Sequence, residues 1–209
     1  MKNDSAFYKS NRLSLLAVGI VLLVINLGCN FSCGKNDFQE ITSDQTAEEG
    51  NKLVREGNAV VEKAAQSGTR AEALSSELLG SENLKKVGNV EKYKEDNKTK
   101  FDELIKLCED SAKDWDAAAA KFEQVSKMNL NEKFKEFNAV LAQGHRKTAE
   151  MQKADAGLAR AYLAEKDPEK HTSIFLEYNK KYAEMTKELA DLKEKSAKIR
   201  SDNPDVFKK

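Results

Sequence analysis

The feature that most constrains this chain is a spacing of apolar residues at alternating three- and four-residue intervals, kept up over long stretches without proline. The spacing is clearest around the only tryptophan, where it gives Phe101, Leu104, Cys108, Ser111, Trp115, Ala118, Phe122 and Val125. Such a repeat lines one face of a helix and is typical of helices that wind around one another with a left-handed supercoil. The only prolines are Pro168 and Pro204. We therefore predict an all-α fold.

Start and stop signals divide the chain into helical segments of similar length. We expect helices over about 43–79, 90–127, 130–166 and 168–201, followed by a tail at 202–209. Gly80 and Gly88 bound a loop after the first segment, and Asp167-Pro168 is a capping residue followed by the residue best suited to a first helical turn. At ~1.5 Å per residue each helix is about 50–57 Å long. Matching lengths and short connections predict a long antiparallel four-helix bundle with coiled-coil-like packing.

The apolar spacing continues in the third and fourth segments. In the third it gives Phe134, Phe137, Leu141, Gly144, Thr148 and Met151, and in the fourth Phe175, Tyr178, Tyr182, Met185, Leu189, Leu192, Ser196 and Ile199. Asp155 then interrupts the row of apolar residues, or stripe, of the third segment. Either Asp155 points inward or the row of buried residues drifts onto Ala154, Leu158 and Ala161. We expect drift, because a straight helix slips by about 20° per heptad against this repeat.

The first segment offers two candidate core faces. Its larger residues are Leu53, Val60, Ser67, Leu74 and Leu78, and small residues recur at strict sevens at Gly50, Gly57, Ala64 and Ala71. The larger residues are expected in the core. The small ones form either a groove for a ligand or partner helix, or a surface that packs closely against large neighbouring side chains. We expect close packing, because large residues facing small ones are ordinary core design.

The N-terminal end has the pattern of an export signal. Residues 1–12 are basic, and an apolar run follows from Leu13 to Gly28. A basic region, an apolar region and a small residue in this order are typical of a secretory signal. The run has about 16 residues, fewer than the ~20 that a helix needs to span a bilayer. We expect residues 1–28 to be a signal peptide or membrane anchor and residues 29–42 a polar tether.

The junction Gly28-Cys29 resembles the lipobox of bacterial lipoproteins, although Asn26 and Leu27 stand where that family has a leucine-like and a small residue. The resemblance covers residues 1–29. It implies cleavage before Cys29, a lipid on the new N-terminal cysteine, and an exported protein that is anchored to a membrane and faces the periplasm or cell exterior. The alternatives are an uncleaved single-pass signal-anchor, or cleavage near Ser32 to give a secreted protein.

The sequence contains no catalytic or cofactor motif that would support a role as an enzyme. His145 and His171 are expected at the surface or flank of their helices and too far apart to share a metal, so we expect no metal and no cofactor. Cys108 lies on a core stripe and is expected to be a small buried hydrophobe, whereas Cys33 lies in the tether. The 35 basic and 35 acidic residues give no general attraction to nucleic acid.

These observations favour a membrane-tethered module with a structural or protein-interaction role. Its partner would be another helical protein or a second copy of the chain, paired through charged helix faces. The alternative is an extracytoplasmic bundle that binds a small molecule. Its ligand would occupy a slot between helices lined by Trp115, Tyr178 and Tyr182, although we expect these rings to belong to the core.

Overall fold

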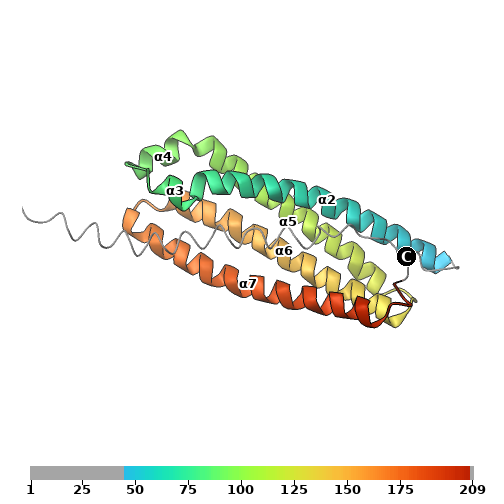
Figure 1. The fold of residues 1–209 in the computed structure, drawn as a ribbon. Coiled ribbons are helices and arrows are strands. Elements are labelled where there is room, and N and C mark those ends of the chain that lie inside the picture. The colour runs from blue at the N-terminus through green and yellow to red at the C-terminus, as the bar shows by residue number, and fades with distance from the viewer. Residues whose placement is uncertain (1–44, 208–209) are drawn as a thin grey trace, which may run out of the picture.

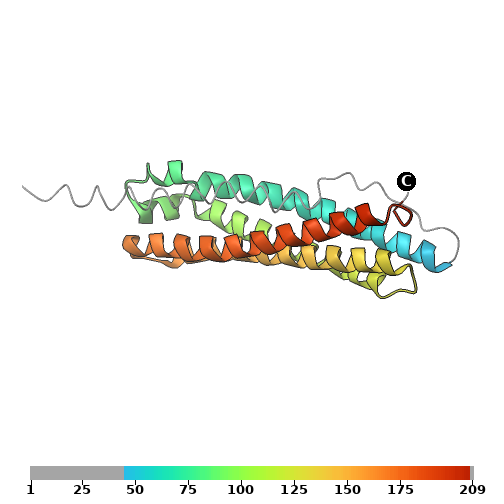
Figure 2. The same ribbon diagram turned by 60° about the horizontal axis from the view of Figure 1, so that its bottom comes forward.

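The computed structural model describes residues 45–207, and this part of the chain is all-helical, with no strand (Figure 1). Its long helices are α2 (Gln45–Leu79), α5 (Lys98–Ser126), α6 (Glu132–Ala164) and α7 (Pro168–Asp202). The short helices α3 (Ser81–Leu84) and α4 (Val90–Asp96) lie between α2 and α5. α2 packs on α5, α5 on α6, and α6 on α7. Figure 2 shows the long helices side by side along one common direction.

The predictions for the N-terminal end fall outside the described residues. They concern the signal or anchor at 1–28, the tether at 29–42, and Cys29 and Cys33. In the part that is described, none of the helices combines the length and the apolar character that a membrane span requires.

Polar side chains fix where α6 and α7 begin. Asn131 accepts a hydrogen bond from the backbone N–H of Lys133 at 2.8 Å, directly before α6. Asp167 accepts one from the backbone N–H of Glu169 at 3.0 Å, and Pro168 is the first residue of α7. Each side chain satisfies an amide that has no partner within the first helical turn. Each of these helices can therefore begin directly after a short connection.

The helix expected over 90–127 is interrupted at Asn97, and the loop expected between Gly80 and Gly88 contains the short helix α3. At Asn97 the backbone has φ −108° and ψ 10°, and the side-chain amide donates to the carbonyl oxygen of Tyr93 at 2.9 Å. Asparagine side chains compete in this way with the helical backbone for hydrogen bonds. As a result α4 diverges from the line of α5 (Figure 1).

The centre of the core is α5, and every position that the spacing predicted on it, from Phe101 to Val125, is buried. α2 meets this helix through its small residues. These are Gly50, Gly57, Ala64 and Ala71, all of them buried. The hydroxyl of Ser111 also donates to the carbonyl oxygen of Ala64 at 2.9 Å. The column of small residues is thus a close-packing surface, as expected.

The larger α2 residues expected in the core lie for the most part at its margin, with Leu53, Val60 and Leu74 packed against the two core clusters. Leu53, Val60, Ser67 and Leu74 are only half-buried, whereas Leu78 is buried. The reason is the close approach at Gly57, where a Cβ atom would lie 3.1 Å from the ring of Phe122. Turning the small column toward α5 lets the two helices approach closely. It brings Val54 and Val61 into the core and leaves Leu53, Val60 and Leu74 at its margin.

The core is divided along the length of the molecule. One cluster includes Phe175 and Met185 of α7 together with residues of α2, α5 and α6. The other surrounds Trp115 and draws its buried residues from α2, α5 and α6. After α7 the chain folds back onto the second cluster, and the ring of Phe207 lies 5.0 Å from that of Phe137. The segment expected as a tail therefore contributes to the packing.

Candidate functional site

The first candidate site is a carboxyl group inside the contact between α6 and α7. Asp155 of α6 accepts a hydrogen bond from the hydroxyl of Tyr178 of α7. Although part of the Asp155 residue remains accessible, its carboxyl group is enclosed, and this desolvation raises its pKa to about 7. The hydrogen bond from Tyr178 opposes the rise and the charge of Glu72 on α2 adds to it. A carboxylic acid here keeps its proton up to neutral pH.

The expectation that the α6 stripe drifts past Asp155 is therefore wrong, because the residue points inward. Its neighbour on the same helix, Gln152, is also buried, and the side-chain oxygen of Gln152 has no hydrogen-bond partner within the described residues. Positions three apart lie on one side of a helix. The seam between α6 and α7 is thus polar at its centre and apolar on both sides.

Cys108 faces this polar centre from α5. It is a buried free thiol. Burial, followed by the nearby charge of Asp155, raises the pKa of the thiol, so the reactive thiolate form is disfavoured. The rings of Tyr178 and Tyr182 lie 5.2 Å apart on the α7 side. Burial also raises the pKa of Tyr178, which keeps its hydroxyl a hydrogen-bond donor to Asp155.

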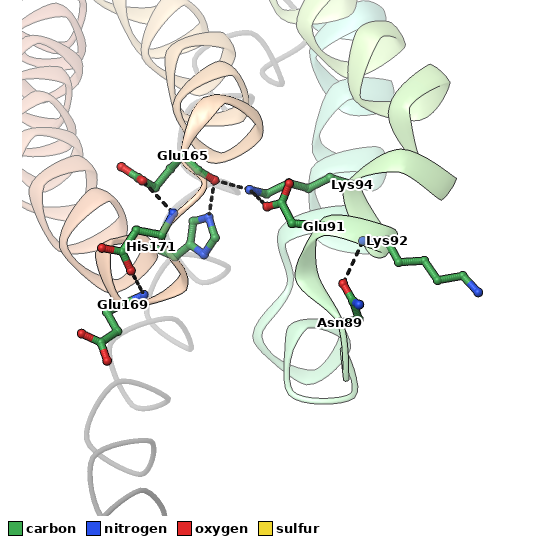
Figure 3. A network of polar contacts seen from close by, with 8 residues as sticks. Asn89, Glu91, Lys92, Lys94, Glu165, Glu169 and His171 are labelled. Atoms are coloured by element: carbon green, nitrogen blue, oxygen red, sulfur yellow. Dashed lines mark hydrogen bonds and ion pairs between the residues drawn. The ribbon is translucent and has the colours of Figure 1, made fainter.

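The second candidate site lies where α4 meets the turn between α6 and α7 (Figure 3). Lys94 of α4 is only 5% exposed, and its ammonium donates to the backbone carbonyl oxygen of Glu165, which ends α6. The same ammonium is 3.0 Å from a carboxylate oxygen of Glu91 and 5.3 Å from the centre of the Tyr162 ring. A cation at this position complements the negative end of the α6 dipole.

His171, in the first turn of α7, contacts the same carbonyl group. Its Nε2 lies 3.2 Å from the carbonyl oxygen of Glu165, and its ring is 4.7 Å from that of Tyr162. Burial, followed by the charge of Lys94, lowers the pKa of His171. The expectation that this histidine lies at the surface is wrong. Lys94 and His171 together join α4, α6 and α7 at one carbonyl group. We interpret these contacts as holding the three helices together.

The prediction of a surface position is also wrong for His145. Its ring lies between those of Trp115 and Phe122, at centroid distances of 5.2 and 5.0 Å. Burial lowers the pKa of His145 to about 3, so the ring is neutral near pH 7. His145 thus takes the place of an aromatic core residue between α5 and α6, and the spacing argument missed it because it takes histidine as polar.

The third candidate site is a surface groove between α6 and α7, with a volume of about 560 Å³. Residues with small or apolar side chains dominate its lining, namely Ala154, Gly157, Leu158, Ala161, Ile174, Tyr178 and Met185, with Glu150, Lys153, Glu177 and Lys181 among them. A Cβ atom at Gly157 would have no other atom within 4 Å. Volumes of this size are typical of small-molecule sites.

The structure brings together only part of the slot expected from the sequence. Tyr178 and Tyr182 belong to one core cluster, and Trp115 belongs to the other. Of these rings, only Tyr178 lines the groove. The spacing of apolar residues does not identify Lys94 or Glu165, because it depends neither on a lysine in a charged segment nor on a backbone carbonyl group.

Ion pairs of the described helices link positions three or four apart on one helix, as in Lys94–Glu91 and Lys135–Glu132, and also link one helix to the next, as in Lys63–Asp114 and Lys147–Glu188. From residue 45 to residue 207, no group of three or more His, Cys, Asp or Glu residues is arranged to hold a metal ion. The group best suited to exchange a proton near neutral pH is the carboxyl of Asp155. No family model, curated protein or solved structure matches this chain.

Proposed function

We propose that this chain is an exported helical bundle, tethered to a membrane by its N-terminal end, with a structural or protein-interaction role and no catalytic activity. It would face the periplasm or the cell exterior. The observation that carries the proposal is the apolar run that ends at Gly28-Cys29, followed after a short polar stretch by the helices that begin at Gln45. A lipid on Cys29 would supply the membrane anchor.

The length of the tether supports a position close to the membrane. Residues 29–44 span at most ~55 Å at ~3.4 Å per residue when fully extended. The 35 residues of α2 form a helix whose length is ~52 Å at ~1.5 Å per residue. A bundle on such a tether stays within about one bundle length of the surface, where it can contact other proteins of the same envelope.

We further propose that the long helices form an antiparallel four-helix bundle with coiled-coil-like packing. Support comes from the order of ion pairs between α2 and α5, in which residue numbers rise on one helix as they fall on the other. These pairs are Glu56–Lys121 at 2.6 Å, Lys63–Asp114 at 3.1 Å and Arg70–Glu103 at 3.3 Å. Exposed pairs contribute little to stability, but they favour one direction of pairing over the other.

The outer face of α7 supports an interaction role. Its exposed residues include the alternating charges Glu177, Lys180, Glu184 and Lys187. Mixed charges on one helix face can pair with those of another helical protein or of a second copy, while they keep the surface soluble.

The test is the mass of the mature N-terminus, recovered from membranes of a bacterial host. We expect wild type to begin at Cys29 with a lipid attached, and Cys29→Ser to lose both the cleavage and the lipid. Cys33→Ser is the matched control, because it removes a cysteine from the tether without changing the proposed lipid site. An intact Met1 or an unmodified start near Ser32 would overturn the lipoprotein proposal.

A second candidate function is the binding of a small apolar molecule in the groove between α6 and α7, which Tyr178 lines. We would test it with the fluorescent probe 1-anilinonaphthalene-8-sulfonate and two variants at the open position Gly157. Gly157→Trp fills the groove, and Gly157→Ala leaves it open. Binding that survives Gly157→Ala and is lost in Gly157→Trp would support this function. Binding that is equal in the two variants, or absent from wild type, would exclude it.

A further inference from the structure

We propose that the contact between Asp155 and Tyr178 is a proton-sensitive contact that controls the attachment of α7. In this proposal α7 is held firmly against α6 while the carboxyl group of Asp155 carries its proton, and it is loosened when that group ionises. The proposal does not rest on the membrane location proposed above.

The position of Asp155 in the seam is the first part of the argument. α7 packs mainly on α6. Asp155 lies within that seam, and the residues of α7 on either side of its partner Tyr178 are the buried Phe175 and Tyr182. A change of charge at this point therefore acts on the main contact that holds α7 to the rest of the described helices.

The groups that surround the carboxyl are the second part. Tyr178 faces it from α7, Cys108 from α5, and Glu72 acts on it from α2. Arg160 of α6 acts on the neighbouring thiol of Cys108, and its guanidinium is hydrogen-bonded to Glu109. Lys153 and Lys181 line the surface groove beside Tyr178, and Lys153 is paired with Asp116. An ionised Asp155 would thus keep one hydrogen-bond donor and be repelled by Glu72. A buried charge without a paired cation destabilises the packing around it.

Other ionisable groups of the seam respond differently to pH. Lys147 of α6 and Glu188 of α7 are 2.7 Å apart, and the pKa of Lys147 is raised by its hydrogen bonds to Glu150 and Glu188, so its charge does not change near neutral pH. His171 gains charge on acidification, and its lowered pKa moves that event to more acidic pH. Asp155 gains charge on alkalinisation, so the direction of the pH effect separates it from His171.

The sign follows from proton linkage. A carboxyl group in water ionises near pH 4, whereas that of Asp155 has a pKa of about 7 in the folded protein. Between these values the detached state loses its proton and the attached state keeps it, so rising pH favours detachment. Above about pH 7 both states are ionised and the effect levels off.

The experiment is hydrogen exchange of the full chain in detergent, read by mass spectrometry and corrected for the intrinsic pH dependence of exchange. We expect protection of α7 to fall by about tenfold to a hundredfold between about pH 5 and pH 8, relative to protection of α5. In Asp155→Asn, which cannot ionise, the ratio of the two protections should not change with pH. Asp116→Asn is the matched control, since Asp116 forms an exposed ion pair with Lys153, and it should behave as wild type.

A ratio that is independent of pH in wild type would overturn the proposal, and so would a fall that persists in Asp155→Asn. Tyr178→Phe provides a second test, because it removes only the hydroxyl that the ionised carboxylate would retain as a donor. In this variant we expect the protection of α7, relative to that of α5, to fall more with rising pH than in wild type. A fall of the same size as in wild type would contradict the proposal. None of these results depends on how the N-terminus is processed.

Discussion

The backbone of Gly57 in α2 lies against the ring of Phe122 in α5, so closely that a Cβ atom would sit 3.1 Å from Cε2 and Cζ of the ring. Phe122 is 1% exposed and packed in the core, so a shift of its ring would disturb the side chains around it. Gly157 of α6 is in the opposite situation, because a Cβ atom there would meet no atom within 4 Å. The two glycines are therefore a matched pair for measuring close helix packing.

We expect Gly57→Ala to destabilise the protein by about 1 kcal/mol, because overpacking against Phe122 outweighs the better helix propensity of alanine. We expect Gly157→Ala to stabilise it by about 0.5–1 kcal/mol, because only the propensity changes. Chemical denaturation of both variants measures the two values. Stabilisation by Gly57→Ala would show that α2 and α5 can separate at no cost.

Truncation of the tryptophan tests whether the second core cluster holds the fold together. Trp115 is 1% exposed and stacks on His145 at 5.2 Å. We expect Trp115→Ala to destabilise the protein by about 3–5 kcal/mol, as the loss of a core aromatic residue does. Urea unfolding followed by circular dichroism gives the value. Stability near that of wild type would place Trp115 outside the core and would favour a role in ligand binding.

A neutral residue at position 94 tests the contact between α4 and the turn that joins α6 to α7, which Figure 3 shows. Lys94→Met keeps most of the aliphatic stem and removes the charge that donates to the carbonyl oxygen of Glu165. We expect a destabilisation of about 1–2 kcal/mol, because that carbonyl group loses a charged donor in a buried setting. Lys98→Met is the control, since the Lys98–Asp102 pair at 2.8 Å is exposed, and its thermal unfolding should match that of wild type. Equal destabilisation by both substitutions would show that the hydrogen bond from Lys94 to Glu165 contributes no more to stability than an exposed ion pair.

His145 should make the protein sensitive to acid. Its pKa is about 3 in the folded protein, because burial disfavours the charged ring, and about 6.5 in an unfolded chain. As pH falls the unfolded chain binds the proton first, so stability that is present above about pH 6.5 is lost progressively toward about pH 3. His145→Phe keeps a ring between Trp115 and Phe122 and cannot be protonated. Its urea midpoint should therefore fall less than that of wild type between about pH 7 and pH 5, and parallel slopes would contradict this account.

The spacing of apolar residues is enough to predict the all-helical fold and the buried face of α5. That helix is packed between α2 and α6, so its large apolar residues are buried. The same rule was only partly right on α2. There the choice between a face of small residues and one of larger residues depends on the ring of Phe122, which lies on another helix. A single-helix pattern contains no information about such a partner.

The candidate site could be predicted only in part. Tyr178 was identified as a possible ligand residue, and the structure places it both at the groove and on Asp155. The choice of helical drift misplaces Asp155, which the spacing itself puts on the buried stripe, and treating histidine as a polar residue misplaces His145. Here a hydroxyl donor and two aromatic rings make burial tolerable. Lys94 is buried by a turn that is distant in sequence, and no local pattern predicts that contact.

The packing of Phe207 on Phe137 brings the last described residues to the end of the molecule where α2 begins (Figure 1). The start of α2 can therefore be joined to the last described residues by a linker, and the chain opened instead at the exposed Gly88 between α3 and α4. Such a circular permutant would keep every contact between the long helices and reverse which end of the molecule carries the termini. For a protein tethered by its N-terminus, it would present the opposite end of the helices to the membrane.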